Sequence, residues 1–214
     1  MLTWDDTGKK LYETGVDHGV LYPMDANGYG DGVAWNGLTT VTETPSGAEA
    51  TNLYADNIKY LELRSAEEFG GTIEAYTYPD EWAECDGSVA LATGVYAGQQ
   101  PRKAFGLSYR TVLGNDVAHE SYGYKLHLVY GATASPSERS YATINDSPEA
   151  ITFSWEFTTT PVQVANHKPV SCLTIDSTKV DATKLKALED ILYGAGQDGK
   201  ARLPLPAEVV TTLS

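Results

Sequence analysis

Several side-chain oxygens in one stretch rich in Asn, Asp and Gly could ligate a calcium ion. Asp25, Asn27 and Gly30 follow the spacing of an EF-hand loop. The spacing fails at the fifth position, which is Tyr29, and at the twelfth, where Asn36 replaces the bidentate glutamate that the loop needs. We therefore expect a polar surface loop here and not a metal site.

A second set of carboxylates has the composition of an acid–base pair. It lies in residues 79–87 and consists of Asp80, Glu81, Glu84 and Asp86. No nucleophile accompanies these acids, and acids in the first turn of a helix are stabilised by the helix dipole alone. We expect a short helix with a structural role, because the segment begins with proline and ends with glycine.

The histidines and cysteines lack the spacing of a metal or redox site. His127 lies beside Lys125 on the polar side of a predicted strand, where we expect a hydrogen-bonding surface group. Cys85 and Cys172 are far apart and outside any CxxC motif, so we expect two reduced thiols. Motifs of serine hydrolases, phosphate-binding loops and zinc proteases are also absent. The sequence predicts no catalytic residue and no cofactor, and it favours a structural or binding role.

The charge balance of the chain is strongly acidic. Asp and Glu number 29 against 15 Lys and Arg, which gives a formal net charge of −14. This balance argues against a protein that must hold DNA, because such affinity rests on cationic groups that displace counterions from phosphates. The N-terminal residues contain no apolar signal segment, and no window has the ~18 apolar residues of a membrane span. We expect a chain that is made in the cytosol and contacts no membrane.

Residues 150–164 show the clearest two-residue alternation in the sequence. One face of an extended strand here carries Ile151, Phe153, Trp155 and Phe157, and the other carries Thr152, Ser154, Glu156 and Thr158. Such alternation predicts a strand with one buried and one solvated side. Candidate strands at 58–64 and 72–78 contain Glu62 and Glu74, whose acidic side chains must face solvent or a partner. A sheet with one wet face is therefore predicted.

The remaining sequence predicts a mostly β (α+β) domain over residues 1–193. Its connection at residues 131–150 is polar, small and proline-containing, which predicts an exposed arm. The further candidate strands lie at residues 20–22, 33–44, 103–113, 122–130 and 170–175.

One convincing helix is predicted at residues 182–193, with Asp181 as its N-cap and Gly194 at its end. Its apolar stripe, which should pack on a sheet, consists of Leu185, Leu188, Ile191 and Leu192. Residues 194–214 are expected to form a flexible spacer and an extended docking tail. The tail, with the apolar and proline residues Leu203, Pro204 and Leu205, is expected to lie against another surface such as a neighbouring subunit.

Eight segments, in order from about residue 11 to residue 193, carry a resemblance to known proteins. They are YETGVDHGVLYP, GVAWNGLTTVTETPSGAE, LYADNIKYL, GTIEAYTYPDEWAECDGS, GQQPRKAFGLSYRT, GYKLHLVYG, INDSPEAITFSWEFTTTPV and LTIDSTKVD, and RLPLP near the C-terminus also matches. These segments closely resemble the major tail protein, or tail tube protein, of long-tailed bacteriophages (siphophages) that infect Gram-positive bacteria. Similar segments that follow one another in the same order over most of a chain are far more specific evidence of a family than any short motif.

The resemblance implies a fold of two packed antiparallel sheets, a β-sandwich or barrel, with a flanking α-helix and extended arms. It implies a structural virion protein that forms hexameric rings, which stack into the tail tube through which the genome is ejected. The implied partners are identical copies, the tape measure protein, the tail terminator and the distal tail or baseplate initiator complex. DNA would pass through the lumen without specific binding. The implied location is the virion, after assembly in the host cytoplasm, and the resemblance implies no catalytic residue or cofactor.

Within that expectation, we hypothesise that some of Glu62, Glu74 and Glu156 face the lumen, because each lies on the wet side of a predicted strand. The alternative is that these glutamates face outward or form salt bridges between subunits. A second class of function is a carbohydrate-binding β-sandwich, in which Trp35, Trp82 and several tyrosines would be stacking platforms. Most aromatic residues occupy the apolar phase of a strand, which favours a core role for them. An enzyme is a third class, without a nucleophile to nominate.

Overall fold

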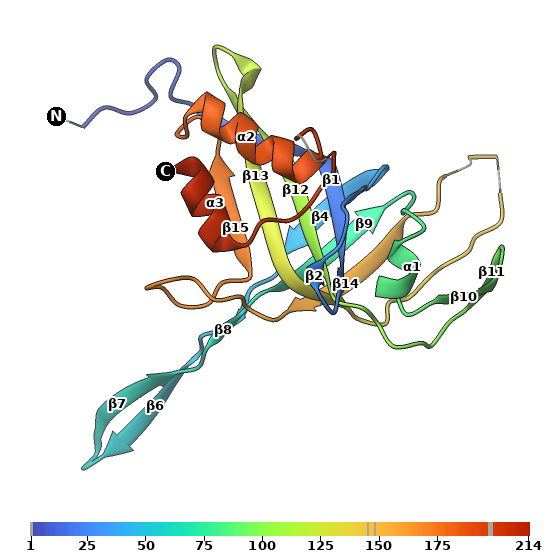
Figure 1. Cartoon of the computed structure of the whole chain (residues 1–214). Helices are drawn as coiled ribbons and strands as arrows, with labels where there is room; N and C mark the ends of the chain where they lie inside the picture. Colours follow the sequence, from blue (N-terminus) through green and yellow to red (C-terminus); the bar gives the residue numbers. More distant parts are fainter. Residues whose placement is uncertain (1, 145, 148, 197–198) are drawn as a thin grey trace.

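The main sheet is antiparallel throughout and accounts for the predicted mostly β class (Figure 1). The computed structural model describes residues 2–144, 146–147, 149–196 and 199–214. The strand order is β2-β1-β12-β13-β14-β9-β4, with β15 on β13 and β3 on β1. These strands are β1 (Leu11–Asp25), β2 (Gly28–Tyr29), β3 (Val33–Ala34), β4 (Leu38–Glu43), β9 (Gly70–Ala75), β12 (Phe105–Asn115), β13 (His119–Ala134), β14 (Phe153–Thr159) and β15 (Cys172–Asp176).

The first layer of the fold consists of β1, β12, β13 and β15, and it is covered on both faces. Leu107 and Val129 lie opposite each other in the register and point into an aromatic core. Their neighbours Leu128 and Tyr130 point the other way, into a second core beneath the C-terminal helices. Because both faces are covered, the burial of β12 and β13 does not alternate along much of their length.

The second layer consists of β14, β9 and β4, and it turns back over the first at Gly131. That glycine has φ of 58°, and an added Cβ would lie 2.3 Å from the carbonyl oxygen of Thr160. Beyond the turn, β13 pairs with β14 only from Ala132 to Ala134. The inner face of β14 then packs against the first layer through Phe153, Trp155 and Phe157, as the alternation predicts, whereas Ile151 lies before the strand and is 38% exposed.

Aromatic rings fill the space between the two layers. Trp155 of β14 is 1% exposed, and its ring centroid lies 5.3 Å from that of Trp82 and 5.8 Å from that of Trp35. Tyr78 and Phe153 complete the cluster around Trp155, at 5.4 and 5.7 Å. The short helix α1 (Trp82–Cys85) is present as predicted, and it contributes Trp82 to this core.

Helix α2 (Ala182–Tyr193) confirms the predicted helix at both ends. The Asp181 carboxylate accepts hydrogen bonds from the backbone N–H groups of Thr183 and Lys184, and Gly194 ends the helix with φ of 72°. The three leucines of the predicted stripe, Leu185, Leu188 and Leu192, are buried against the first layer. The sequence was sufficient to predict this helix because its caps and its apolar stripe are all local to residues 181–194.

The prediction of an extended C-terminal docking tail is wrong. Residues 206–213 form helix α3 (Pro206–Leu213), and the segment before it packs on the same chain (Figure 1). Leu203 is 4% exposed in the core beneath α2, and the Tyr130 hydroxyl donates to the Pro204 carbonyl at 2.9 Å. Leu203 and Pro204 are therefore not available to a neighbouring subunit, while Leu205 is 53% exposed. Pro206 begins α3, since a proline in the first turn costs no hydrogen bond. Residues 197 and 198 of the predicted spacer lie outside the described residues.

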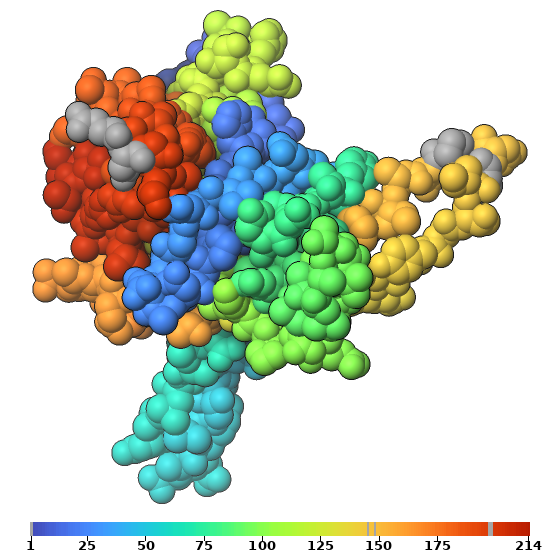
Figure 2. Space-filling view, turned by 45° about the vertical axis from the view of Figure 1, so that its right-hand side comes forward, coloured from blue at the N-terminus to red at the C-terminus, as the bar shows by residue number. Residues whose placement is uncertain are grey.

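Two hairpins and one arm extend from the two layers (Figures 1 and 2). The long hairpin comprises β6 (Ala50–Ala55) and β7 (Ile58–Arg64), and a neck of β5 (Ser46–Gly47) and β8 (Glu67–Glu68) joins it to the sheet. The short hairpin comprises β10 (Val89–Ala92) and β11 (Val95–Ala97). The arm starts later than predicted because β13 continues to Ala134, and an ion pair between Arg139 and Asp86 attaches it to α1.

Candidate functional site

The outer face of the second layer carries hydroxyls and carboxylates on three adjacent strands. Its residues are Thr40 and Thr42 of β4, Thr72 and Glu74 of β9, and Ser154, Glu156 and Thr158 of β14. We call this set the polar face. Trp155 and Ile73, which lie opposite each other in the register, point to the core between these residues. The alternation of each strand therefore builds the polar face on the back of the aromatic core.

The structure brings together two of the three glutamates that were predicted to face a lumen. Glu74 pairs with Ser154 and Glu156 pairs with Thr72, so the two acids occupy diagonal positions on adjacent strands of the polar face. Glu62 lies apart from them on β7 of the long hairpin, where Lys59 and Arg64 pair with its carboxylate at 2.5 and 2.9 Å. The three glutamates do not form a single surface.

The long hairpin exposes apolar side chains on a structure that has little support of its own. Asp56 and Asn57, with φ of 51° and 66°, form its tight turn, and these residue types tolerate that conformation. The exposed fractions of its apolar side chains range from 37% to 69%, for Leu53, Tyr54, Ile58, Tyr60, Leu61 and Leu63. A two-stranded hairpin is marginally stable in water by itself. Six exposed apolar side chains on so small an element favour a role in contacting another surface.

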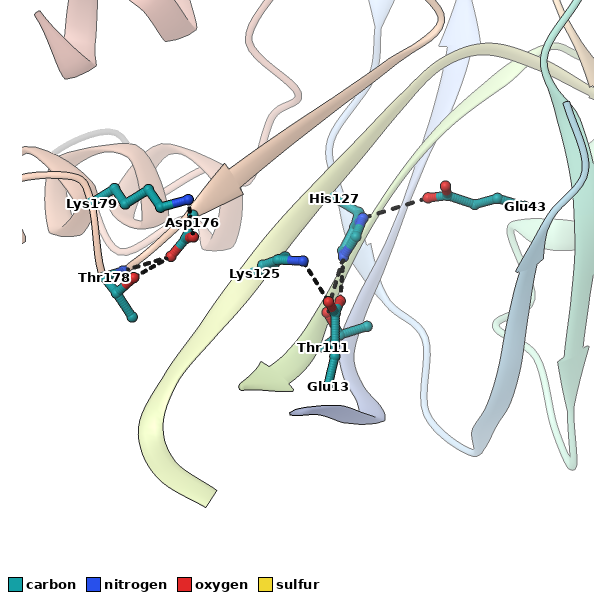
Figure 3. Close-up of polar contacts among 8 residues, drawn as sticks. All are labelled: Glu13, Glu43, Thr111, Lys125, His127, Asp176, Thr178 and Lys179. Carbon is teal, nitrogen blue, oxygen red and sulfur yellow. Dashed lines mark hydrogen bonds and ion pairs between the residues drawn. The ribbon is translucent and has the colours of Figure 1, made fainter. Parts of the chain in front are cut away.

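A buried polar cluster lies where the aromatic core ends, between the two layers (Figure 3). At its centre is His127 of β13, which is 8% exposed, so the prediction of a surface group is wrong. Its ring stacks on Tyr109 of β12, with centroids 4.7 Å apart and planes 2° apart. The alternation of the strand placed His127 beside Lys125 correctly, but it held no sign that strand β4 would cover the histidine.

Two carboxylates from distant parts of the sequence flank the His127 ring. Glu43, the last residue of β4, accepts a hydrogen bond from the Tyr109 hydroxyl at 2.6 Å. The His127 ring, whose Nδ1 atom lies 3.5 Å from Oε1 of Glu43, lowers the pKa of that carboxyl, which outweighs the opposing effect of its burial, and the hydrogen bond from Tyr109 lowers the pKa further. Burial raises the pKa of Glu13 on β1, but hydrogen bonds from Lys125 and Thr111 reverse this and leave it lowered. Both carboxylates therefore remain ionised well below neutral pH.

The other residues considered for chemistry have structural roles. The Asp25 carboxylate accepts the backbone N–H of Asn27 at 2.7 Å and so closes the turn between β1 and β2. Cys85 and Cys172 are free thiols, and burial raises the pKa of each to about 12. Within residues 2–144, 146–147, 149–196 and 199–214, no three His, Cys, Asp or Glu side chains are arranged to hold a metal ion. None of the helices in the described part of the chain is long and apolar enough to cross a membrane.

The two tryptophans named as carbohydrate-stacking platforms are core residues. Trp35 is 3% exposed and Trp82 is fully buried, with their ring centroids 4.7 Å apart. The indole nitrogen of Trp35 donates to the Thr77 carbonyl at 3.0 Å. Neither ring can stack on a sugar, so this part of the carbohydrate interpretation is wrong.

No protein-family model matches the chain, and no curated protein matches it at a significant level.

Proposed function

We propose that the chain is the tail tube subunit of a long-tailed bacteriophage, a structural virion protein that forms stacked hexameric rings. The observation that carries the proposal is the polar face, an uncovered sheet surface of threonine, serine and glutamate behind a rigid aromatic core. The likeness of the eight sequence segments to tail tube proteins supports the same reading. In the assembled tube, the polar faces of identical copies would line the lumen.

The chemistry of the polar face suits a surface past which DNA moves without binding. A polyanion is held by cationic groups, and this face places Glu74 and Glu156 among hydroxyls with no lysine or arginine in its register positions. The whole chain has a formal net charge of −14, which works in the same direction. The lumen would repel phosphates, so the genome would slide through it during ejection.

The long hairpin supports self-association as the way in which the subunits are joined. Its exposed apolar side chains would be buried against the adjacent copy, which would also supply the support that a two-stranded hairpin lacks. The partners beyond identical copies would be the tape measure protein, the terminator and the initiator complex. Assembly would take place in the host cytoplasm, and the finished protein would belong to the virion.

Negative-stain electron microscopy of the concentrated protein, with its initiator complex supplied, tests this function. We expect hollow rods of uniform width from the native chain. The double variant Tyr60→Ser/Leu63→Ser should form no rods or short ones, because it removes apolar contacts from the hairpin. Tyr76→Ser, which changes an exposed side chain outside the hairpin, is the matched control and should form rods. A native protein that stays a single particle under these conditions contradicts the proposal.

A further inference from the structure

A groove of about 730 Å³ lies at the root of the long hairpin, between the neck and the loop that joins β14 to β15. Its walls are mostly apolar, with Ala66 and Phe69 on the neck side and Pro161, Pro169 and Val170 on the loop side. Ala66 and both prolines are exposed, so these walls are open to solvent in the free chain. A groove of this size can hold a bulky side chain together with its neighbours.

The charged residues of the groove favour a ligand with an acidic group. Arg64 pairs with Glu62 at 2.9 Å. Lys168, on the loop side, is exposed and forms no ion pair within the described residues. The acid that lines the groove, Glu67, is on the neck side. We therefore expect an apolar ligand whose acidic group lies against the loop, next to Lys168.

Residues 2–5 have both properties of such a ligand. Trp4 is 76% exposed, whereas Trp35, Trp82 and Trp155 are buried in the aromatic core. A tryptophan side chain buries roughly 150–250 Å² when it docks, and most of this surface of Trp4 is in water. Asp5 follows Trp4 and forms no ion pair in the part of the chain that the structure describes. The segment thus offers a large apolar group next to an unpaired carboxylate.

The segment is anchored to the sheet at Gly8. The backbone N–H of Gly8 donates to Oδ1 of Asp116 at 3.0 Å, and Nδ2 of Asn115 donates to the Gly8 carbonyl at 3.1 Å. Asn115 is the last residue of β12, and Asp116 follows it. The anchor therefore lies at the end of β12 where the chain turns into β13.

The groove lies at the opposite end of the same strand. Phe105, the first residue of β12, is opposite Ala132, which pairs in turn with Thr159. The Thr159 hydroxyl donates to the carbonyl of the groove residue Phe69 at 2.6 Å. The 11 residues of β12 span roughly 35 Å, but the four residues that lead from the anchor back to Trp4 reach at most about 14 Å. Trp4 therefore cannot enter the groove of its own chain.

The tip of the long hairpin and the short hairpin match the groove less well. At the tip, Lys59 stands between the exposed Ile58 and Tyr60, and it would bring a second cation to Lys168. The short hairpin exposes Leu91, but residues 89–97 contain no charged residue that could pair with the lysine.

We propose that Trp4 of one copy docks in the groove of a second copy and that Asp5 pairs with Lys168 there. The segment and the long hairpin lie at opposite ends of the subunit (Figure 1). A contact between unlike surfaces leaves one free segment and one free groove, so it can repeat from copy to copy. The inference rests on the proposed function in one respect, which is that identical copies associate.

Titration of the full chain with a peptide tests this contact without assembly. The receptor is the Trp4→Ala chain, which has lost its own docking group, and the peptide LTWDDTG has the sequence of residues 2–8. In nitrogen-15 spectra, we expect saturable shifts at the amides of Ala66, Lys168 and Val170. Adding Lys168→Glu to the receptor should weaken binding by about tenfold, and a peptide with Asp5→Lys should restore it.

The control for this titration is Lys10→Glu in the same receptor, which makes the same change of charge at an exposed lysine outside the groove. This control should bind the peptide as the Trp4→Ala receptor does. Absence of shifts at the groove, or an unchanged affinity of the Lys168→Glu receptor, overturns the proposal.

Tryptophan fluorescence follows the same contact in the assembled protein. Because the other three tryptophans are buried, acrylamide should quench mainly Trp4 in the free subunit, and Trp4→Phe should remove this quenchable part. We expect the quenching to be largely lost in rods of the native chain. Rods in which Trp4 stays as quenchable as in the free subunit overturn the docking and leave the tube function standing. If the native chain forms no rods, the tube function fails, and the peptide titration still decides the docking.

Discussion

At the residue scale, the ion pair between Arg110 and Asp17 joins β1 to β12. Nε and Nη2 of Arg110 donate to the two carboxylate oxygens of Asp17 at 2.7 and 2.8 Å, and the guanidinium lies 4.8 Å from the centre of the Tyr124 ring. The hydrogen bond from Arg110 lowers the pKa of Asp17 against the opposing effect of burial. A bidentate pair of this kind fixes the geometry of both side chains.

Because the pKa of Asp17 is lowered in the folded state, its ionised carboxylate adds to the free energy of unfolding. A group whose pKa is lower in the folded state stabilises the fold above its unfolded pKa, and the contribution is lost as the pH falls through the folded value. We expect Asp17→Asn to lower the free energy of unfolding by about 1 kcal/mol at pH 7, a modest value because the carboxylate is partly exposed. The difference from the native chain should vanish near pH 2, as measured by urea unfolding. Asp31→Asn, at a pair with Lys200 that is more exposed, is the control and should change little. A deficit that persists near pH 2 would contradict this account.

The sequence predicted the faces of individual residues better than their surroundings. Alternation placed Trp155 toward the core and Glu156 away from it, because successive side chains of a strand point to opposite faces of the sheet. It could not foresee that Glu13 and Glu43 would meet at His127, since these residues are 30 positions or more apart and belong to different layers. Contacts of that kind depend on the topology of the whole sheet.

At the scale of elements, helices differed in how far the sequence could predict them. Helix α2 has an aspartate cap, an apolar stripe and a terminal glycine, all of them local signals. Helix α3 has no side-chain cap, and its eight residues pack beside α2 through Val209. Short helices of this kind take their stability from tertiary packing. That is why the sequence predicted an extended tail where the structure has a helix.

Loss of the cap of α2 should have a measurable cost. Asp181→Ala removes the acceptor for the N–H groups of Thr183 and Lys184, and we expect the free energy of unfolding to fall by about 1 kcal/mol. Thermal unfolding followed by circular dichroism is the measurement. The control Thr183→Ala keeps the capping carboxylate and should stay within about 0.5 kcal/mol of the native chain. Equal effects of the two changes would show that the cap is not what stabilises the helix.

Two leucines of the C-terminal segment form a matched pair that tests its packing. Leu203→Ala should lower the free energy of unfolding by roughly 2–4 kcal/mol, because Leu203 is 4% exposed and lies in the core beneath the helices. Leu205→Ala removes the same atoms from a side chain that is 53% exposed, and it should cost less than about 0.5 kcal/mol. Chemical denaturation of the two variants compares them directly. Similar small losses would mean that the segment is not docked on its own chain.

At the scale of the whole molecule, the fold separates a rigid part from parts that extend into solvent. The two layers enclose a core of aromatic rings and carry α2 and α3 on the outer side of the first layer. The polar face lies on the outer side of the second layer, so the aromatic core and the first layer separate it from the helices. In the proposed tube, the polar face would be turned toward the lumen and the helices away from it.

Reversal of charge on the polar face should slow the passage of DNA. In phage particles built with Glu74→Lys/Glu156→Lys, we expect tails of normal length and slower DNA ejection, because lysines in the lumen would attract phosphates. The control Glu120→Lys/Glu149→Lys makes the same change of charge at exposed sites away from the polar face. Ejection kinetics measured by fluorescence of released DNA compare the two. Native kinetics in the first variant would place these glutamates outside the lumen.

The narrow neck that joins the long hairpin to the sheet should make the free subunit susceptible to proteolysis in the hairpin. Only two residue pairs form the neck, and at Gly47, with φ of 78°, the two strands come so close that a Cβ would lie 2.4 Å from the Ala66 carbonyl. Beyond it, Lys59 and Arg64 offer trypsin two exposed cleavage sites on a weakly supported element. We expect trypsin to nick the free subunit there first and to leave the remaining sheet intact. The same two sites should resist trypsin once copies have joined, so their rate of cleavage would report assembly.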